Sequence, residues 1–265
     1  MAGLGGLSVN AGKLSGKIAA ITGGGDGFGK GIAQKFAAEG AAVAICDINL
    51  PAARRVIAGI EEGGGTGLAF EADVTDNSSL EAFVDAVVAR FGRLDVWVGN
   101  AGRAGGSASE EVVEAEYRQM IDLNLCAVFF GAQLAGRQMI AQGEGGRIIN
   151  MASVAGYRGI PQRAAYCASK AGVVMTTYVL AEEWAKHDIR VNSISPGYAD
   201  TPLFWSSAGS GSRMPLEQLM SRVPTGKLIT VEQVARAALY LASEDSDAVT
   251  GLDLRVDGAL AVGNI

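Results

Sequence analysis

The chain has 265 residues, of which 49% are hydrophobic and 19% charged, and its formal net charge is −6. This hydrophobic content is typical of a protein with a large buried core and argues against a disordered chain. The negative net charge and the absence of any run of Lys or Arg exclude a nucleic-acid-binding surface, because such a surface needs cations to replace the counterions of the phosphates.

The sequence also bears on the cellular location of the protein. No segment approaches the length of about 18 consecutive apolar residues that a membrane span requires. Residues 1–15 are small and rich in glycine, without the basic start and apolar core of a signal peptide. We therefore expect a soluble, cytoplasmic protein.

Cysteine and histidine give no metal site or nucleophilic triad. Cys46, Cys126 and Cys167 have no metal-ligand spacing, and their odd number argues against a disulfide framework. We expect them to be buried free thiols. The single histidine, His187, follows a helical segment, where a capping or surface role is expected.

Short apolar runs alternate with longer segments of helical periodicity along the whole chain. In order, the expected elements are a strand over residues 17–22, a helix over 29–39, a strand over 42–46, a helix that begins at Pro51, a strand over 67–71, a helix over 78–91 capped by Asn77, a strand over 94–98, a long and mostly helical segment over 110–139, a strand over 147–151, a helix over 164–186, a strand over 189–194, a looser stretch over 201–226, a helix over 231–241 and a strand over 252–256.

This strict alternation predicts an α/β fold with a parallel sheet covered by helices on both faces. No repeat and no linker divides the chain. We expect one domain over residues 1–265, with a Rossmann-like, doubly wound sheet of seven parallel strands and a substrate loop at about 201–226.

A glycine-rich turn lies between the first expected strand and the first expected helix, with the sequence Thr22-Gly23-Gly24-Gly25-Asp26-Gly27-Phe28-Gly29. Glycines let the backbone turn tightly and approach a pyrophosphate, while the helix N-terminus offers unpaired N–H groups. The strand–turn–helix position favours dinucleotide binding over a merely structural turn. The expected cofactor residues in this turn are Gly23, Asp26, Gly27, Phe28 and Gly29.

The second expected strand is followed by Asp47, 18 residues beyond Gly29. A carboxylate at this point of the fold meets the adenosine ribose hydroxyls of NAD. Asp26 and Asp47 would both repel the 2′-phosphate of NADP, and no Lys or Arg stands at position 48 or 49 to receive it. The sequence therefore predicts NAD as the cofactor, with Ile48 beside Asp47 in the site.

Tyr166 and Lys170 are four residues apart in an expected helix, so their side chains share one face. The ammonium favours phenolate and should lower a tyrosine pKa that starts near 10. Such a phenol can pass a proton to or from an alcohol oxygen. Chance also produces this short motif, and it gains support from the glycine turn and from Ser153, thirteen residues upstream of Tyr166.

Together these residues resemble the short-chain dehydrogenase/reductase family in its compact, single-domain form. The resemblance covers residues 17–258 and rests, in order, on Thr22 to Gly29, Asp73, Asn100-Ala101-Gly102, Asn124, Ser153, Tyr166 with Lys170, and Pro196-Gly197 with Thr201. Three positions depart from the commonest family pattern: Gly99, Ala152 and Ala259. None of the three removes a catalytic group.

The resemblance implies an NAD-dependent oxidoreductase that interconverts a secondary alcohol and a ketone. It implies Tyr166 as general acid/base, Lys170 on the nicotinamide ribose and Ser153 on the substrate oxygen. Asn124 would hold a water molecule in the proton relay. The remaining cofactor contacts that it implies are Asp73 and Val74 at the adenine, Asn100, Ala101 and Gly102 along the cofactor, and Pro196, Gly197, Ala199 and Thr201 at the nicotinamide end.

The sequence indicates the substrate less sharply than it indicates the cofactor. Between residues 202 and 223, glycine and serine alternate with Leu203, Phe204, Trp205, Met214 and Leu219, which indicates a mobile lid with apolar contacts. Such a pocket favours a medium-sized secondary alcohol or ketone, cyclic or steroid-like, unless these side chains pack on the domain or on a neighbouring subunit.

Three functions stay open at this point: a secondary-alcohol dehydrogenase, a 3-oxoacyl-thioester reductase or sugar/polyol dehydrogenase, and a binding protein that senses NAD(H) without turnover. A sensor has no need of Ser153, Tyr166 and Lys170 together. The resemblance further implies a homotetramer in which the long helices after the fourth and fifth strands form one interface.

Overall fold

The computed structural model describes residues 12–208 and 216–262. Among these residues, seven strands form one sheet in the order β3-β2-β1-β4-β5-β6-β7, and every neighbouring pair is parallel. The strands are β1 (Ile18–Thr22), β2 (Ala42–Asp47), β3 (Thr66–Glu71), β4 (Val96–Gly99), β5 (Gly146–Met151), β6 (Ile189–Pro196) and β7 (Asp253–Val256). The expected doubly wound α/β fold is confirmed.

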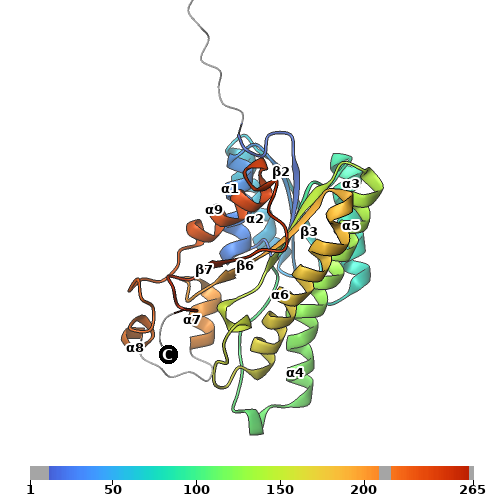
Figure 1. The fold of residues 1–265 in the computed structure, drawn as a ribbon. Coiled ribbons are helices and arrows are strands. Elements are labelled where there is room, and N and C mark those ends of the chain that lie inside the picture. Colours follow the sequence, from blue (N-terminus) through green and yellow to red (C-terminus); the bar gives the residue numbers. More distant parts are fainter. Residues whose placement is uncertain (1–11, 209–215, 263–265) are drawn as a thin grey trace, which may run out of the picture.

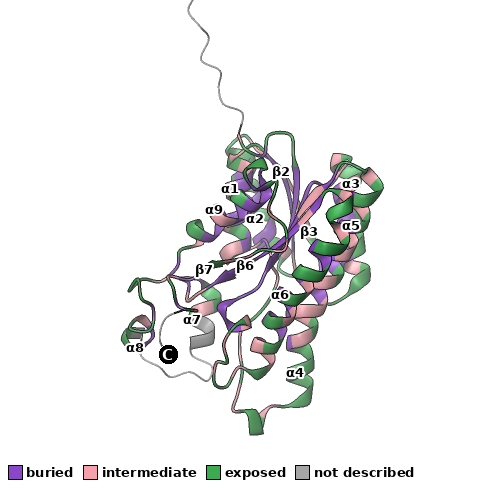
Figure 2. Cartoon of the chain, viewed as in Figure 1, coloured by how far each residue is buried: buried purple, intermediate pink, exposed green. Residues whose placement is uncertain are grey.

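Helices cover both faces of the sheet (Figure 1). One layer consists of α1 (Gly27–Ala38), α2 (Leu50–Glu62) and α9 (Val231–Ala242), and the other of α3 (Asn77–Phe91), α5 (Ala127–Gln142) and α6 (Ala164–Trp184). Each layer has its own apolar cluster against the sheet. Because both faces are covered, β1 and β4 are buried along their whole length. In Figure 2 the buried residues, in purple, gather between the two helix layers. This is why the central strands are continuously apolar.

The chain enters the sheet at its centre and builds outward in both directions. After β1, β2 and β3 have filled one half, the chain returns to place β4 beside β1. The loops that follow β1 and β4 lead to opposite halves of the sheet, and ligands of open α/β sheets bind in the crevice at that point.

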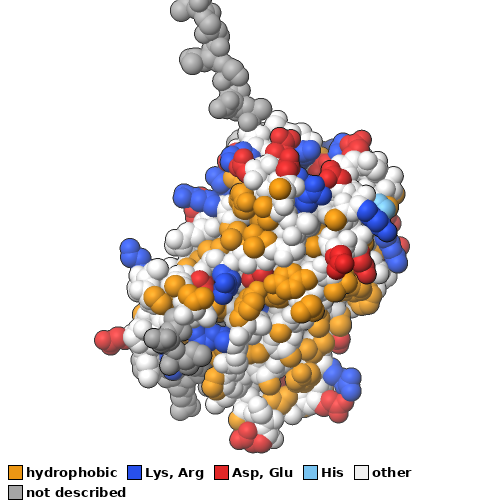
Figure 3. Space-filling model, in the orientation of Figure 1, with side chains coloured by type: hydrophobic (Ala, Val, Ile, Leu, Met, Phe, Trp, Pro, Cys, Tyr) orange, Lys and Arg blue, Asp and Glu red, His pale blue; other side chains and the backbone are white. Residues whose placement is uncertain are grey.

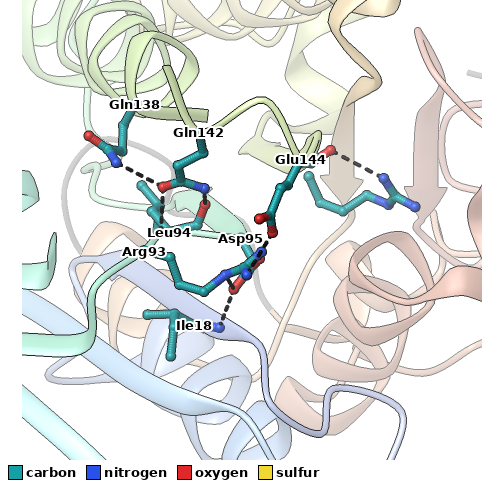
Figure 4. A network of polar contacts seen from close by, with 9 residues as sticks. Ile18, Arg93, Leu94, Asp95, Gln138, Gln142 and Glu144 are labelled. Carbon is teal, nitrogen blue, oxygen red and sulfur yellow. Dashed lines mark hydrogen bonds and ion pairs between the residues drawn. The ribbon is translucent and has the colours of Figure 1, made fainter. Parts of the chain in front are cut away.

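The other edge of the sheet, at the amino ends of β1 and β4, is closed by polar side chains (Figure 4). Asp95 accepts a hydrogen bond from the backbone N–H of Ile18 at 2.8 Å and from Arg93 Nε at 3.0 Å. Gln142, at the end of α5, bonds both the N–H and the C=O of Leu94 at 2.9 Å. These bonds fix the two central strands to each other and to α5 at the edge away from the crevice.

Side-chain caps decide where several helices begin. Asp26 caps α1 by accepting a hydrogen bond from the Gly27 N–H at 2.7 Å. Helix α3 is capped by Asp76, whose carboxylate accepts from the Ser78 N–H at 2.9 Å, and Asn77 is the first helical residue. The expected Asn77 cap is therefore wrong by one position, because Asp and Asn both cap helices well and stand side by side here.

Two expected segments are more divided than their sequences indicate. The segment 110–139 consists of a 3₁₀ turn (Ser109–Glu111), α4 (Glu114–Ile121), a π-helical segment (Asp122–Cys126) and α5. The looser stretch over 201–226 contains α7 (Pro202–Ala208) and α8 (Leu216–Met220). Residues 209–215, which include Met214 of the expected lid, lie outside the described residues.

All three cysteines are free thiols, but only Cys46 is buried, whereas Cys126 and Cys167 are partly exposed. The expectation that all three are buried is therefore wrong for two of them. His187 ends a 3₁₀ turn (Ala185–His187) directly after α6. No helix within residues 12–208 and 216–262 is long and apolar enough to cross a bilayer.

Candidate active site

A cavity of about 900 Å³ lies at the carboxyl edge of the sheet. It is lined by most of the residues that the sequence assigned to the site: Gly23, Asp26, Gly27, Phe28, Asp47, Ile48, Asp73, Val74, Asn100, Ala101, Gly102, Ser153, Tyr166, Lys170, Pro196, Gly197, Ala199 and Thr201. Gly29 and Asn124 do not line it. Residues far apart in the chain meet here because parallel strands all end at the same edge.

The glycine turn needs its glycines for close approach. Gly23 has a φ of +63°, and a Cβ there would lie 2.9 Å from the Cα of Ala101. A Cβ on Gly29 would lie 2.1 Å from the carbonyl oxygen of Gly23, so a side chain at position 29 would push the turn apart. Gly29 therefore shapes the turn from behind, and the cavity wall is formed by Gly23, Gly27 and the side chains of Asp26 and Phe28.

Asn100 ties the loops after β1 and β4 together. Its side-chain amide donates to the carbonyl oxygens of Thr22 and Gly23 at 2.9 and 3.0 Å. The Thr22 hydroxyl in turn accepts from the backbone N–H groups of Asn100 and Ala101, both at 3.0 Å. Both sides of the crevice are held rigidly where a pyrophosphate can approach the backbone N–H groups of the turn.

The carboxylate of Asp47 is oriented by the backbone. It accepts from the N–H of Gly25 and of Asn49, each at 2.9 Å. Asp73 is held in the same way by the N–H and the hydroxyl of Thr75, at 2.9 and 2.7 Å. Next to Asp47, the side chain of Ile48 is 72% exposed, which leaves an apolar surface free at the rim of the cavity.

Ser153, Tyr166 and Lys170 lie at the other half of the sheet. Ser153 follows β5, and its hydroxyl accepts from the Ala155 N–H at 3.1 Å. Lys170 is buried, and its ammonium donates to the Met151 carbonyl oxygen at 2.7 Å. The Lys170 Nζ lies 5.9 Å from the centre of the Tyr166 ring. The α6 helix therefore brings the phenol and the ammonium to one side of the cavity, as their spacing predicted.

The electrostatics differ from the sequence expectation. Burial raises the pKa of Tyr166, against the opposing effects of the Ser153 hydroxyl and the positive charge of Arg163. Burial lowers the pKa of Lys170 to about 8. The expectation that Lys170 holds the pKa of this phenol below its ordinary value is wrong for this structure, because desolvation of the phenol outweighs the charges that favour phenolate.

Asn124 is buried in the π-helical segment behind the cavity. Its side chain bonds the backbone of Arg103 twice, accepting from the N–H at 2.9 Å and donating to the C=O at 2.8 Å. A Cβ on Gly102 would lie 2.9 Å from its amide oxygen and 3.8 Å from the Lys170 Nζ. Asn124 thus anchors the loop after β4 and lies next to Gly102 without lining the cavity.

The apolar part of the lining comes partly from the expected lid. Leu203, Phe204 and Leu219 line the cavity, whereas Trp205 is 47% exposed and donates from its indole Nε1 to Asp200 at 2.8 Å. Of the four described residues that the sequence assigned to the apolar contacts of the lid, Leu203, Phe204 and Leu219 line the cavity and Trp205 does not.

Several lining residues were not named from the sequence: Arg103, Gln119, Asp122, Ile160, Arg163 and Tyr198. Arg103 directly follows Gly102, and Arg163 precedes Tyr166 by three residues, so sequence distance could have indicated both. Gln119 lies on α4, and Asp122 begins the π-helical segment between α4 and α5. No local sequence pattern predicted the π-helical segment.

The residues present fit a dinucleotide cofactor: a glycine turn at a helix N-terminus, a fixed carboxylate after β2 and a cavity that spans the switch point of the sheet. Within the described ranges, no group of three or more His, Cys, Asp or Glu side chains is arranged to hold an ion.

Comparison with known proteins agrees with this geometry. A family model described as enoyl-(acyl carrier protein) reductase matches residues 23–260. The chain is 38% identical over 250 residues to a D-threitol dehydrogenase of Mycolicibacterium smegmatis, covering 94% of this chain and 95% of that one. It is 39% identical over 251 residues to a 3beta-hydroxysteroid dehydrogenase of Eggerthella lenta, with 94% and 95% covered.

A solved structure of similar fold is a variant of actinorhodin polyketide ketoreductase crystallised with NADPH. It superimposes with a TM-score of 0.87 at 33% identity, covering 92% of this chain and 97% of that one.

Proposed function

The chain belongs to the short-chain dehydrogenase/reductase family and is an alcohol dehydrogenase that acts on CH–OH donors, and from that premise we propose that it uses NAD(H) and carries the proton on Tyr166. The single observation that supports this best is that Ser153, Tyr166 and Lys170 line the same cavity as the glycine turn and Asp47. A protein that only senses the cofactor would not need these three groups at the other end of the cavity.

In this mechanism the nicotinamide supplies the hydride chemistry when it is bound, and the protein orients it and handles the proton. Reduction of a ketone leaves negative charge on the carbonyl oxygen. Tyr166 donates its phenolic proton to that oxygen, and the Ser153 hydroxyl donates a hydrogen bond to it, so that the developing charge is stabilised. In the oxidation direction Tyr166 accepts the alcohol proton.

The other residues bind the cofactor. Lys170 holds the nicotinamide ribose, and Pro196, Gly197, Ala199 and Thr201 border the nicotinamide end. At the other end Asp73 and Val74 border the adenine. Their position along the lining of one cavity supports these roles. Asn124 holds the loop that borders the cofactor, and it also holds a water molecule of the proton relay.

Asp47 and Asp26 favour NAD over NADP. Both carboxylates line the cavity after β1 and β2, where they would repel a 2′-phosphate. The test measures kcat/KM for NAD and kcat/KM for NADP in the oxidation of the same alcohol. A preference for NADP would overturn this part of the proposal.

The substrate proposed is a medium-sized secondary alcohol or the matching ketone. The apolar side chains of Leu203, Phe204 and Leu219 support a substrate with a cyclic or steroid-like skeleton. The similar hydroxysteroid dehydrogenase is named for a substrate of this kind. A polyol is the second candidate, since the similar D-threitol dehydrogenase is named for one. A 3-oxoacyl thioester is disfavoured because its reduction usually draws on NADPH.

The experiment is a substrate screen in which the absorbance of NADH measures turnover. Cyclic alcohols, sterols, polyols, a 3-oxoacyl thioester and an enoyl thioester are supplied with NAD or NADH. Turnover of the secondary alcohols supports the proposal. Tight NADH binding without turnover of any compound would instead support the cofactor sensor.

We propose further that the protein is a cytoplasmic homotetramer in which α5 and α6 form one interface with a second copy of the chain. Exposed apolar side chains on these helices support this: Phe130 at 36%, Met175 at 60%, Tyr178 at 38% and Val179 at 48%. Figure 3 shows apolar side chains on the face that α6 presents. Light scattering after gel filtration tests it, and a monomeric mass would contradict it.

A further inference from the structure

A tight turn over residues 257–262, the C-terminal turn, directly follows β7. Both carboxylate oxygens of Asp257 accept backbone hydrogen bonds within it, one from the Ala259 N–H at 2.9 Å and the other from the Ala261 N–H at 2.8 Å. Gly258 and Ala259 have φ values of +60° and +68°, of which the second is uncommon for a residue with a side chain. The Asp257 carboxylate therefore holds the turn in one specific shape.

The side chain of Leu260 points from this turn into a small apolar cluster. Leu260 is 1% exposed and packs with Val154 and Val223, and Tyr198 packs against the same cluster. Val154 directly follows Ser153, Tyr198 lies in the loop after β6, and the third partner follows α8. Val154 and Tyr198 line the cavity, whereas Leu260 does not. One buried side chain thus connects three separate segments around the cavity wall.

The backbone of the C-terminal turn also contacts the segment after α8. A Cβ on Gly258 would lie 2.4 Å from the Thr225 hydroxyl oxygen and 3.0 Å from Val223 Cγ1. The Gly258 carbonyl accepts from the Thr225 N–H at 3.4 Å. Helix α8 carries Leu219, which is buried and lines the cavity. The turn is therefore packed against the segment that supplies part of the apolar wall.

A charged side chain joins the C-terminal turn to the loop after β5. Arg158 Nη1 donates to the Leu260 carbonyl oxygen at 3.1 Å, and the arginine is partly buried. A hydrogen bond from a charged donor stabilises more than one between neutral groups. Because Arg158 lies five residues after Ser153, the loop that carries this serine meets the turn at two points, through Val154 and through the guanidinium.

We infer that Leu260 and Arg158 are positioning residues of the substrate site. They hold the C-terminal turn against the loop that carries Ser153 and against the segment that carries Leu219. This rests on the proposed function, in which Ser153 bonds the substrate oxygen and Leu219 borders the substrate. Misplacing such groups slows the reaction strongly. Cofactor affinity should be kept, because the glycine turn and Asp47 lie in the other half of the sheet.

The first test removes the side chain that connects the three segments. The assay uses the secondary alcohol that the substrate screen oxidises fastest, with NAD in excess. In Leu260→Ala we expect kcat/KM to fall by about 10- to 100-fold. Leu260→Met conserves the volume of the side chain and should stay close to the wild type. The Kd of NADH, from fluorescence titration, should be unchanged in both variants.

Leu94→Ala is the matched control for a loss of stability. Leu94 is as deeply buried, at 0% exposed, but it directly precedes the central strand pair at the edge of the sheet away from the cavity. Thermal denaturation should show that both alanine variants are destabilised, while Leu94→Ala keeps the kcat/KM of the wild type. An equal fall in kcat/KM would mean that Leu260 only supports the fold, and would overturn the inference.

The second test changes the guanidinium and leaves the apolar cluster intact. Arg158→Met keeps an apolar stem but removes the donor to the Leu260 carbonyl, so kcat/KM should fall by about tenfold. Arg158→Lys can still donate to this carbonyl and should retain more of the activity. If Leu260→Ala does not fold, this pair decides between the outcomes.

Wild-type kcat/KM in every folded variant of Leu260 and Arg158 would overturn the inference while the oxidoreductase stands. A loss of NADH affinity as large as the fall in kcat/KM would also overturn it, because the C-terminal turn would then support the cofactor site. If the wild type oxidises no alcohol with either cofactor, the proposed function itself fails, and the inference falls with it.

Discussion

The ammonium of Lys170 lies 5.9 Å from the centre of the Tyr166 ring, while it donates a hydrogen bond to the Met151 carbonyl at 2.7 Å. The lysine thus reaches the carboxyl end of β5 beneath the phenol and does not bond the phenolic oxygen. Its charge is available to a ligand in the cavity, whereas the protonation of Tyr166 depends on Ser153, Arg163 and burial.

The buried lysine makes stability depend on pH. The pKa of Lys170 is about 8 in the folded protein, against an ordinary value of 10.5. Between these values the unfolded chain binds more protons, so the free energy of unfolding rises with pH, by at most about 1.4 kcal/mol per pH unit. Lys170→Met should remove this rise. Urea denaturation of both proteins near pH 8, 9 and 10 measures it, and equal slopes would contradict the burial of this charge.

Asp47 should control the choice of cofactor. Asp47→Asn keeps the shape of the side chain and one acceptor for the turn, but removes the charge that would repel a 2′-phosphate. We expect the ratio of kcat/KM for NADP to that for NAD to rise by about tenfold or more, equivalent to about 1.4 kcal/mol. An unchanged ratio in steady-state kinetics would show that other residues select the cofactor.

Asn124 should matter first for stability. Asn124→Ala removes a buried side chain and the partner of the part-buried N–H and C=O of Arg103, which should cost about 1 kcal/mol for each hydrogen bond. Asn124→Asp keeps the acceptor but buries a carboxylate that faces the Arg103 carbonyl, so it should be the least stable of the three proteins. Denaturant unfolding ranks the three proteins. Full stability of Asn124→Ala, combined with a loss of turnover, would favour a direct role in the proton relay.

A hydroxyl at position 99 should be more stabilising than a methyl group. Two buried polar atoms, Trp97 Nε1 and Asn150 Oδ1, have no hydrogen-bond partner among the described residues. A Cβ on Gly99 would lie 3.6 Å and 3.3 Å from them. A serine hydroxyl can accept from the indole and donate to the amide oxygen, so Gly99→Ser should exceed Gly99→Ala in stability by about 1 kcal/mol. Equal midpoints of thermal unfolding would contradict this.

Local signals in the sequence were enough to predict the fold and most of the site. The glycine turn, the apolar strands and the spacing of Tyr166 and Lys170 each depend on neighbouring residues, and the strand ends then bring them to one edge. The cap of α3 was misplaced by one residue because Asp76 and Asn77 are nearly equivalent as caps.

What the sequence could not supply depends on tertiary structure. The π-helical segment that contains Asp122 and the buried Asn124 has no local sequence pattern that predicts it. The raised pKa of Tyr166 follows from the burial of the phenol, which outweighs the nearby charges. The close approach of Gly106 to the backbone of Gln162 and Arg163 joins segments that are far apart in the sequence.

The measurement that tests the central claim most directly is the turnover of Tyr166→Phe with its cofactor affinity determined on the same sample. Because this change removes only the proton carrier, kcat should fall by about 10²- to 10⁴-fold while the Kd of NADH, from fluorescence titration, stays within about twofold. Tyr240→Phe, on the exposed face of α9, is the control and should match the wild type. Unchanged kcat in Tyr166→Phe would contradict the account.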